Sequence, residues 1–235
     1  MSTGQAWDKW WDQHGRVYTE QEQQANGAEY VEQLVGELRE FVPNFAPRTI
    51  LDFGCGLGRI MLPLAQAFPQ AQSVGVDISD EAIGQARTRL SSCGVQVSFV
   101  NLTAAEIQGS YDLLHSFIVF QHIPVRAGLK RFAELIAKLN PNGTGVMHFV
   151  YAHRKSFSRR ALYHARKWLP GAQALGNILS SIPPLPFVQM NPYPVDELLR
   201  ILQENGCHRV GARFSEHSGY LGVRLMFQKR SLPLL

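Results

Sequence analysis

The sequence predicts an α/β fold built around a mostly parallel sheet, and three features support this prediction. Strand-like and helix-like segments alternate between residues 48 and 151. Parallel neighbours need crossover connections, which are right-handed and cover both faces of the sheet with helices. A glycine-rich turn joins the first strand to its helix, and two strand-like runs near residue 220 predict an antiparallel hairpin at the sheet edge.

A helical leader, residues 1–47, precedes the predicted sheet. Apolar residues recur at helical spacing over residues 28–41, and Pro43 and Pro47 end that helix. The leader is rich in large aromatic residues, namely Trp7, Trp10, Trp11 and Tyr18. Two interpretations stay open: a helix starting at Gln5 either docks itself through these rings or closes the active site from the N-terminal side.

The alternating region, residues 48–151, contains the expected core. Its predicted strands are RTILDF, QSVGVD, QVSFVNL, YDLLHSFIVF and TGVMHFVY. The predicted helices are RIMLPLAQAF, DEAIGQARTRLSSC, a short helix at 104–108 and a longer helix from Pro124 to about Leu139. Ser79 is the expected N-cap of the second helix and Gly94 its stop, and NPNG before the last strand predicts a turn.

The alternation stops after Tyr151, and residues 152–193 are an expected lid or substrate-binding insertion. Within it, residues 156–169 predict a basic amphipathic helix. Three roles stay open for this helix: packing on the core, covering an apolar or anionic substrate, or making a peripheral membrane contact. Residues 168–195 are uncharged, but six prolines argue against a transmembrane helix. A final helix and the hairpin (194–235) complete a predicted single domain.

Composition and charge limit the class of protein. The chain has 235 residues, 45% of them hydrophobic, which is enough for one sizeable core. The net charge of +4 is unevenly spread, because residues 1–47 are acidic and residues 151–167 carry six basic residues without an acid. This pattern favours a local basic patch over a polyanion-binding protein. Cys55, Cys93 and Cys207 contain no CxxC pair, so neither disulfides nor a metal site is predicted. With no signal-peptide pattern, we expect a cytoplasmic protein.

The segment ILDFGCGLGR carries the chemistry. Gly54, Gly56 and Gly58 lie between strand and helix, where the missing Cβ atoms let the backbone turn tightly and approach a ligand. Dinucleotide-binding loops follow GxGxxG, whereas this loop is GxGxG preceded by Asp52. Asp77 ends the next strand, where a carboxylate can accept hydrogen bonds from both ribose hydroxyls. These features favour an adenosine-type ligand over a mere packing turn followed by a helix-capping acid.

With these residues the chain resembles the class I S-adenosylmethionine-dependent methyltransferases that act on small molecules. The resemblance rests on the loop from Asp52 to Gly58, on Asp77, on YDLLHSF as the fourth strand and on the final hairpin. It covers roughly residues 48–150 and 194–229. It implies a Rossmann-like sheet of seven mostly parallel strands, with S-adenosylmethionine as the cofactor.

The resemblance also implies roles for individual residues. The glycine loop would accept the methionine end of the cofactor, Asp77 would hold the ribose, and Ile78 would pack on the adenine. Thr103 stands where the family usually has an Asp that binds the adenine amino group, and its hydroxyl can also accept a hydrogen bond. Ser116 and Phe117, late in the fourth strand, complete the expected cofactor-binding residues.

A polar pair, Gln121 and His122, interrupts the apolar run of the fourth strand just before Pro124. Ligands of open parallel sheets lie outside the carboxyl edge, at the switch in strand order, so this pair is expected to face the reaction zone. The near-neutral pKa typical of an imidazole makes His122 the candidate catalytic base, with hydrogen bonding to nearby backbone as the alternative. His148 and His153 are weaker candidates for substrate contact.

The predicted function is methyl transfer from S-adenosylmethionine to a small molecule, preferably to a hydroxyl oxygen of a natural product, a sugar or a lipid-like acceptor. A non-catalytic cofactor-binding regulator or scaffold is the alternative. A nucleic-acid methyltransferase is less favoured, because the NPPY-like run MNPYP precedes a late helix instead of following the fourth strand. The oligomeric state stays open.

Overall fold

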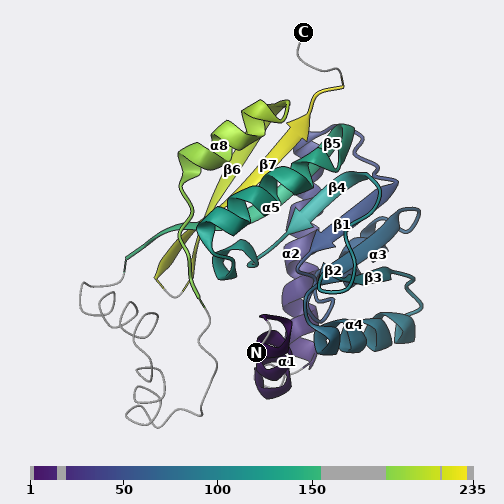
Figure 1. Cartoon of the computed structure of the whole chain (residues 1–235). Helices are drawn as coiled ribbons and strands as arrows, with labels where there is room; N and C mark the ends of the chain where they lie inside the picture. The colour runs from purple at the N-terminus through teal and green to yellow at the C-terminus, as the bar shows by residue number, and fades with distance from the viewer. Residues whose placement is uncertain (1–2, 15–19, 155–188, 218, 232–235) are drawn as a thin grey trace, which may run out of the picture.

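The fold is a seven-stranded sheet with helices on both faces, as predicted (Figure 1). The computed structural model describes residues 3–14, 20–154, 189–217 and 219–231. The strand order is β3-β2-β1-β4-β5-β7-β6, with β1 to β5 parallel and β7 antiparallel to both of its neighbours. The strands are β1 Thr49–Phe53, β2 Gln72–Asp77, β3 Ser98–Asn101, β4 Tyr111–Ser116, β5 Leu139–His153, β6 Cys207–His217 and β7 Tyr220–Lys229. Strand order reverses between β1 and β4, which creates the switch point where such sheets bind ligands.

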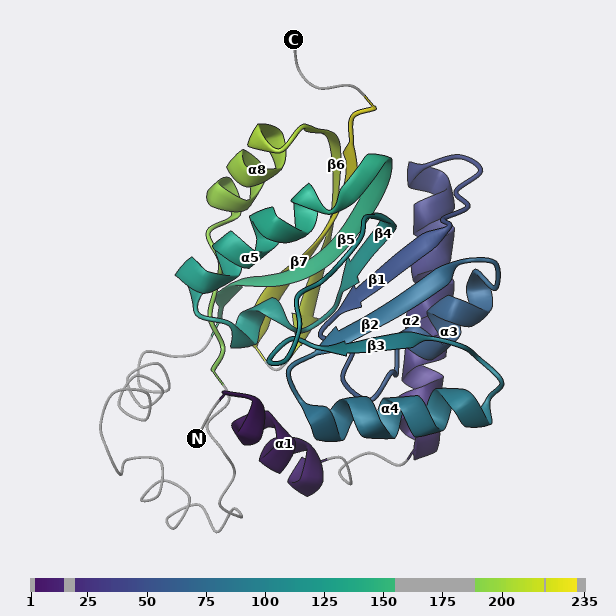
Figure 2. The same ribbon diagram turned by 45° about the vertical axis from the view of Figure 1, so that its right-hand side comes forward.

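Two layers of helices cover the sheet (Figure 2). The helices are α1 Thr3–His14, α2 Glu20–Phe41, α3 Met61–Ala67, α4 Asp80–Ser92, α5 Val125–Ala137 and α8 Val195–Glu204, with a 3-10 turn, η1, at Phe120–His122. One face packs α2 and α3 on Ile50, Leu113 and Val146. The opposite face packs α5 and α8 around a cluster of aromatic rings that includes Phe120, Phe132, Phe149, Tyr193 and Phe227.

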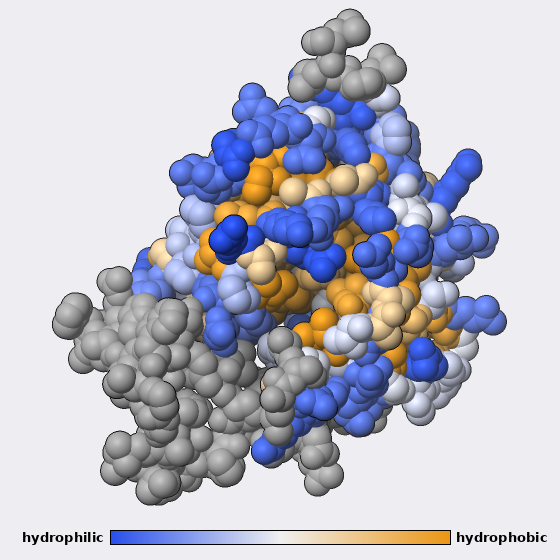
Figure 3. All heavy atoms as spheres, in the orientation of Figure 1, coloured by the Kyte–Doolittle hydropathy of each residue, from blue (hydrophilic) through white to orange (hydrophobic). Residues whose placement is uncertain are grey.

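Apolar side chains show between hydrophilic ones over the face that carries α5 and α8 (Figure 3). Helix α5 is amphipathic in the expected way, because Phe132, Leu135 and Ile136 are buried while Lys130 and Arg131 lie at the surface and pair with Glu134. Burying each such side chain stabilises the fold by about 1.5–3 kcal/mol. This face therefore holds η1 and the end of β4 against a rigid apolar layer.

Three predicted elements differ from the structure. Residues 104–108 form no helix. The backbone N–H groups of Ala104 and Ala105 both donate to the Asn101 carbonyl, and these bonds close a turn instead. The fourth strand ends at Ser116 instead of residue 120, since Ile118 has a φ of 62° and leaves the extended conformation. The NPNG run lies inside β5, where a register shift against β4 absorbs the turn.

Other predictions are confirmed or fall outside the described residues. Apart from the helix expected at 104–108, the helices expected within the described residues are present, as are the N-cap Ser79 and the antiparallel hairpin. The predicted helix at 156–169 lies outside the described residues, as do Tyr18 and the side chains of Trp10 and Trp11. Within the described part of the chain, no helix is both long enough and apolar enough to cross a membrane.

Two helical glycines provide a matched test of packing in this fold. A Cβ at Gly128 in α5 would lie 1.8 Å from the Tyr193 hydroxyl oxygen, whereas a Cβ at Gly84 in α4 would meet nothing within 4 Å. We expect Gly128→Ala to lower the free energy of unfolding by about 1–3 kcal/mol through overpacking. Gly84→Ala should raise it by about 0.5–1 kcal/mol through helix propensity. Denaturant unfolding of both variants measures this, and equal shifts would contradict the packing.

Candidate active site

The glycine loop after β1 is locked to the end of β2. Gly54 N–H and Cys55 N–H both donate to the Val76 carbonyl, at 2.8 and 3.0 Å. Gly54, Gly56 and Gly58 all have positive φ, at 75°, 51° and 73°. A Cβ at Gly54 would lie 2.3 Å from the Val119 side chain, so this position requires glycine for space as well as for conformation.

Asp77 closes the clamp on this loop. Its Oδ2 accepts a hydrogen bond from Gly56 N–H at 2.9 Å, while its Oδ1 accepts from the backbone N–H groups of Ile78 and Ser79. Burial raises the pKa of Asp77, and the three backbone donors oppose that rise. The alternative role, as cap of the next helix, belongs to Ser79, whose hydroxyl accepts from Ala82 N–H. Asp77 therefore shapes the loop at the switch point.

Asp52 lies at the end of β1 and is 2% exposed. His115, its neighbour across the β1–β4 pairing, donates from Nδ1–H to Asp52 Oδ1 at 2.7 Å. Tyr30 of α2 reaches the other ring nitrogen of His115, with its hydroxyl 3.0 Å from Nε2. The structure thus extends the predicted acid into a buried polar row that the sequence did not reveal.

The other predicted cofactor residues occupy different environments. The Ser116 hydroxyl is buried and donates to the Phe53 carbonyl at 2.9 Å, while Phe117 packs on Tyr30 with ring centroids 4.3 Å apart. Thr103 is exposed and donates from Oγ1 to Asn101 Oδ1 at 2.7 Å, which leaves its lone pairs available. Cofactor contacts by Ser116, Phe117, Thr103 and the half-buried Ile78 stay predictions.

Helix α1 lies across this edge of the sheet (Figures 1 and 2). Asp8 accepts a hydrogen bond from the Ser79 hydroxyl at 2.6 Å, and a Cβ at Gly4 would lie 2.8 Å from the Ile78 carbonyl oxygen. At the other side, the Trp7 ring meets the His122 ring edge-on with centroids 5.3 Å apart. Helix α1 therefore spans from the turn after β2 to η1, and this position agrees with its interpretation as a cover of the site.

His122 is held by a segment that is distant in sequence. Its Nδ1 lies 2.8 Å from the Gln189 carbonyl, and because a carbonyl can only accept, Nδ1 carries the proton. The lone pair then resides on Nε2, where Gln121 Nε2 makes a long contact of 3.4 Å. Gln121 itself is buried, and its Oε1 has no hydrogen-bond partner among the described residues. This arrangement leaves Nε2 as the basic nitrogen.

The MNPYP run returns to the end of β4 although it follows a long insertion. Asn191 donates from Nδ2 to the carbonyls of Gln121 and Ile123, both at 3.1 Å, and the Tyr193 hydroxyl donates to Ile123 O at 2.9 Å. These bonds fasten the run to η1 through backbone groups. The Asn191 amide thus serves the protein's own backbone, and Pro194 leads into α8 as predicted.

The two weaker candidates for substrate contact, His148 and His153, lie in the second half of β5. His148 is buried and its Nε2 lies 3.0 Å from the Ser215 hydroxyl, while His153 packs edge-on against Tyr220. Both are held within the sheet that β5 forms with β6 and β7. Among the described residues, no three His, Cys, Asp or Glu side chains gather as a metal site would require.

Sequence reasoning missed His115, Tyr30 and Gln189. One signal was present for His115, because a histidine stands among apolar residues in YDLLHSF at the strand that pairs with β1. Its partner could be named only once the register placed it opposite Asp52. Gln189 contributes a backbone carbonyl, which carries no side-chain signal at all.

Comparison with known proteins agrees with this fold. Residues 50–143 match the family described as a methyltransferase domain. The trans-aconitate 2-methyltransferase of Rhodopseudomonas palustris is 36% identical over 109 residues, which cover 46% of this chain and 40% of that enzyme. The ubiquinone biosynthesis O-methyltransferase of Bordetella pertussis is 29% identical over 127 residues, or 52% of this chain and 51% of that enzyme. The chain thus spans about half the length of these curated relatives, or less.

A solved structure extends the likeness over nearly the whole chain. The magnesium protoporphyrin IX methyltransferase of Synechocystis PCC 6803, crystallised with bound SAH, superposes with a TM-score of 0.64. That likeness covers 97% of this chain and 94% of the other at 21% identity, which establishes a shared fold. Three observations point to the same kind of domain: the family match, the GxGxG loop bonded to Asp77, and the seven-stranded sheet. Residues 50–143 therefore match the methyltransferase-domain family, and the chain shares its fold with a methyltransferase that was crystallised with bound SAH.

Proposed function

We propose that this protein transfers the methyl group of S-adenosylmethionine to a small-molecule acceptor, at a hydroxyl oxygen. The observation that carries the proposal is the clamp of Asp77 on Gly56 at the switch between β1 and β4. The relatives support a small-molecule acceptor, because their names refer to trans-aconitate and to ubiquinone biosynthesis. That this protein also methylates a small molecule is part of the proposal.

The described residues fit this cofactor. Three alternating left-handed glycines carry no Cβ atoms that would crowd a ligand, Asp52 precedes the loop, and the Asp77 carboxylate bonds to its middle glycine. A methionine amino group is cationic, so an acidic environment suits that end of the molecule. Asp77, at the end of β2, would hold the ribose, with Ile78 and Thr103 toward the base.

Bound S-adenosylmethionine supplies a methyl group that its sulfonium already activates. The main task of the protein is therefore to align the acceptor in a dry site, where effective molarities of roughly 10⁵ to 10⁸ M are available. The cover formed by α1 and the aromatic packing of η1 serve this exclusion of water. Because a hydroxyl must lose its proton, His122 Nε2 is proposed as the acceptor of that proton, with Gln189 O fixing the ring.

Cofactor binding is the first test of the proposal. We expect isothermal titration with S-adenosylhomocysteine to show binding by the wild-type protein. Gly54→Ala should weaken it by about 10–100-fold, because a left-handed alanine costs about 1–3 kcal/mol and its Cβ would meet Val119. Gly84→Ala, an exposed glycine-to-alanine change in α4, is the control and should bind as tightly as wild type. Absence of binding by the wild type would remove the proposal.

Catalysis by His122 is the second test. We expect His122→Ala to lower kcat by about 10²–10⁴-fold with a hydroxyl acceptor while the Kd for S-adenosylhomocysteine stays unchanged. His208→Ala, at an exposed histidine of β6, is the matched control. Turnover by His122→Ala within about twofold of wild type would show that no base acts through this residue.

The class of acceptor is tested with labelled S-adenosylmethionine. Methyl transfer to hydroxyl acceptors from a panel of carboxylates, phenols and sugars is the expected result. Transfer to no acceptor, despite cofactor binding, would favour the non-catalytic cofactor-binding alternative. Labelling of nucleic acid with a steep salt dependence would favour a nucleic-acid methyltransferase instead.

A further inference from the structure

A row of buried polar groups runs from the glycine loop to helix α2. It comprises Asp52, His115 and Tyr30, joined by contacts of 2.7 and 3.0 Å. The side chains of His115 and Asp52 are 0% and 3% exposed, so neither exchanges its partner for bulk water. The row lies on the sheet face that α2 otherwise covers with apolar residues such as Leu34 and Leu38.

The donors and acceptors along this row have one consistent order. Burial raises the pKa of Tyr30, against the opposing charge of Arg224, so the phenol keeps its proton. Tyr30 O–H therefore donates to His115 Nε2, which leaves the ring proton of His115 on Nδ1. That proton is donated to Asp52 Oδ1. Among the described residues, His115 is the sole hydrogen-bond donor to Asp52.

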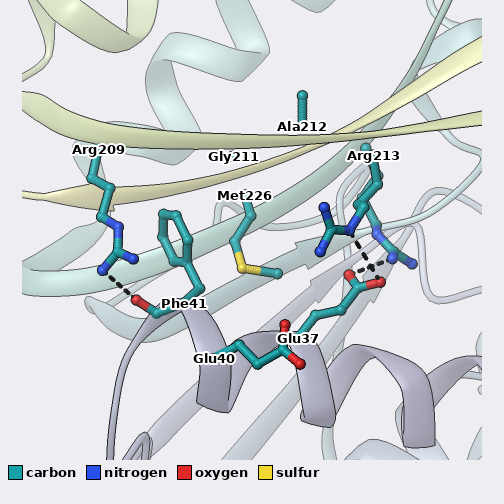
Figure 4. Close-up of a pocket in the computed structure, with 9 residues that line it drawn as sticks. Glu37, Glu40, Phe41, Arg209, Gly211, Ala212, Arg213 and Met226 are labelled. Atoms are coloured by element: carbon teal, nitrogen blue, oxygen red, sulfur yellow. Dashed lines mark hydrogen bonds and ion pairs between the residues drawn. The ribbon is translucent and has the colours of Figure 1, made fainter.

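Charged side chains hold Tyr30, which is the end of the row farthest from the glycine loop. The guanidinium carbon of Arg224 lies 5.3 Å from the centroid of the Tyr30 ring, and Arg224 pairs with Glu37 of α2. Arg213 Nε lies 3.8 Å from the other carboxylate oxygen of Glu37. These side chains line a cavity of about 210 Å³ between α2 and strands β6 and β7 (Figure 4). These contacts hold Tyr30 against the sheet at the point where α2 crosses it.

A buried carboxylate is costly unless hydrogen bonds orient and satisfy it. Burial raises the pKa of Cys55 and of Asp77, and the negative charge of nearby Asp52 adds to both rises. Its Oδ1 accepts the hydrogen bond from His115, and no described residue donates to its Oδ2. Whatever fixes the first oxygen therefore sets the direction of the second.

We infer that His115 and Tyr30 are positioning residues: they hold Asp52 so that its carboxylate meets the cationic amino end of the cofactor. This inference rests on the proposed function, because it assigns the supports of the same cofactor site. It places part of the cofactor affinity in α2, a helix outside the segment that matches the methyltransferase family.

The test measures the Kd for S-adenosylhomocysteine by calorimetry in three variants. His115→Leu removes the donor and should raise Kd by about 10–100-fold, since a lost hydrogen bond to a charged group has an effect of this size. His115→Asn places an amide N–H at the position of Nδ1 and should restore Kd to within about fivefold of wild type. Tyr30→Phe keeps the ring contacts with Phe117 and Arg224 and should give an intermediate rise.

Two measurements separate positioning from general stability. Leu202→Ala, a buried change in α8 on the other face, should lower the denaturant midpoint of unfolding because it leaves a cavity, and it should leave Kd unchanged. Nitrogen NMR of His115 should show the proton on Nδ1 in wild type and a mixed tautomer in Tyr30→Phe.

Each outcome decides the inference. If the wild type does not bind S-adenosylhomocysteine, the proposed function fails. If the wild type binds and His115→Leu binds equally well, or if His115→Asn is as weak as His115→Leu, the inference alone is overturned. Should His115→Leu fail to fold, the comparison of His115→Asn with Tyr30→Phe still decides, because wild-type affinity in Tyr30→Phe would contradict the role of the row.

Discussion

The hydrogen bond from Gly56 N–H to the Asp77 carboxylate is the constraint on which the site depends. It joins the loop after β1 to the last residue of β2, and the two donors to Val76 O reinforce it. Because Gly54, Gly56 and Gly58 have no side chains and each adopts a positive φ, the conformation of the loop depends on this support from its backbone hydrogen bonds. The burial that raises the pKa of Asp77 is the cost, and three backbone donors offset part of that cost.

The two faces of the sheet contribute differently to the site. The face under α5 and α8 is an aromatic core, and it fixes η1 through Phe120, which packs on Phe149 with centroids 4.7 Å apart. The face under α2 contains the polar row of Asp52, His115 and Tyr30 inside an otherwise apolar layer. Such a row gives less stability than apolar packing of the same volume, so its presence is best explained by the direction it imposes on Asp52.

Segments far apart in the chain meet at the carboxyl edge of the sheet. Gln189 lies 67 residues from His122 and still holds its Nδ1, and Trp7 of α1 packs on the same ring. Asn191 and Tyr193 fasten their segment to η1 through the backbone carbonyls of Gln121 and Ile123, and the same segment carries the Gln189 carbonyl that bonds the His122 ring. The proposed base, His122, is therefore positioned by one segment that precedes the glycine loop in the chain and by another that follows β5.

The sequence by itself determined the α/β alternation, the glycine loop, the partner acid Asp77 and the resemblance to a methyltransferase domain, because each depends on local spacing along the chain. Local signals also misled: NPNG predicted a turn yet lies within β5, and a helix was predicted at 104–108 where the Asn101 carbonyl closes a turn with the N–H groups of Ala104 and Ala105. The tertiary structure alone decided that His115 bonds Asp52, 63 residues away, and that Gln189 orients His122. The physical reason is that strand register and helix docking bring these groups together, and neither leaves a periodic trace in the sequence.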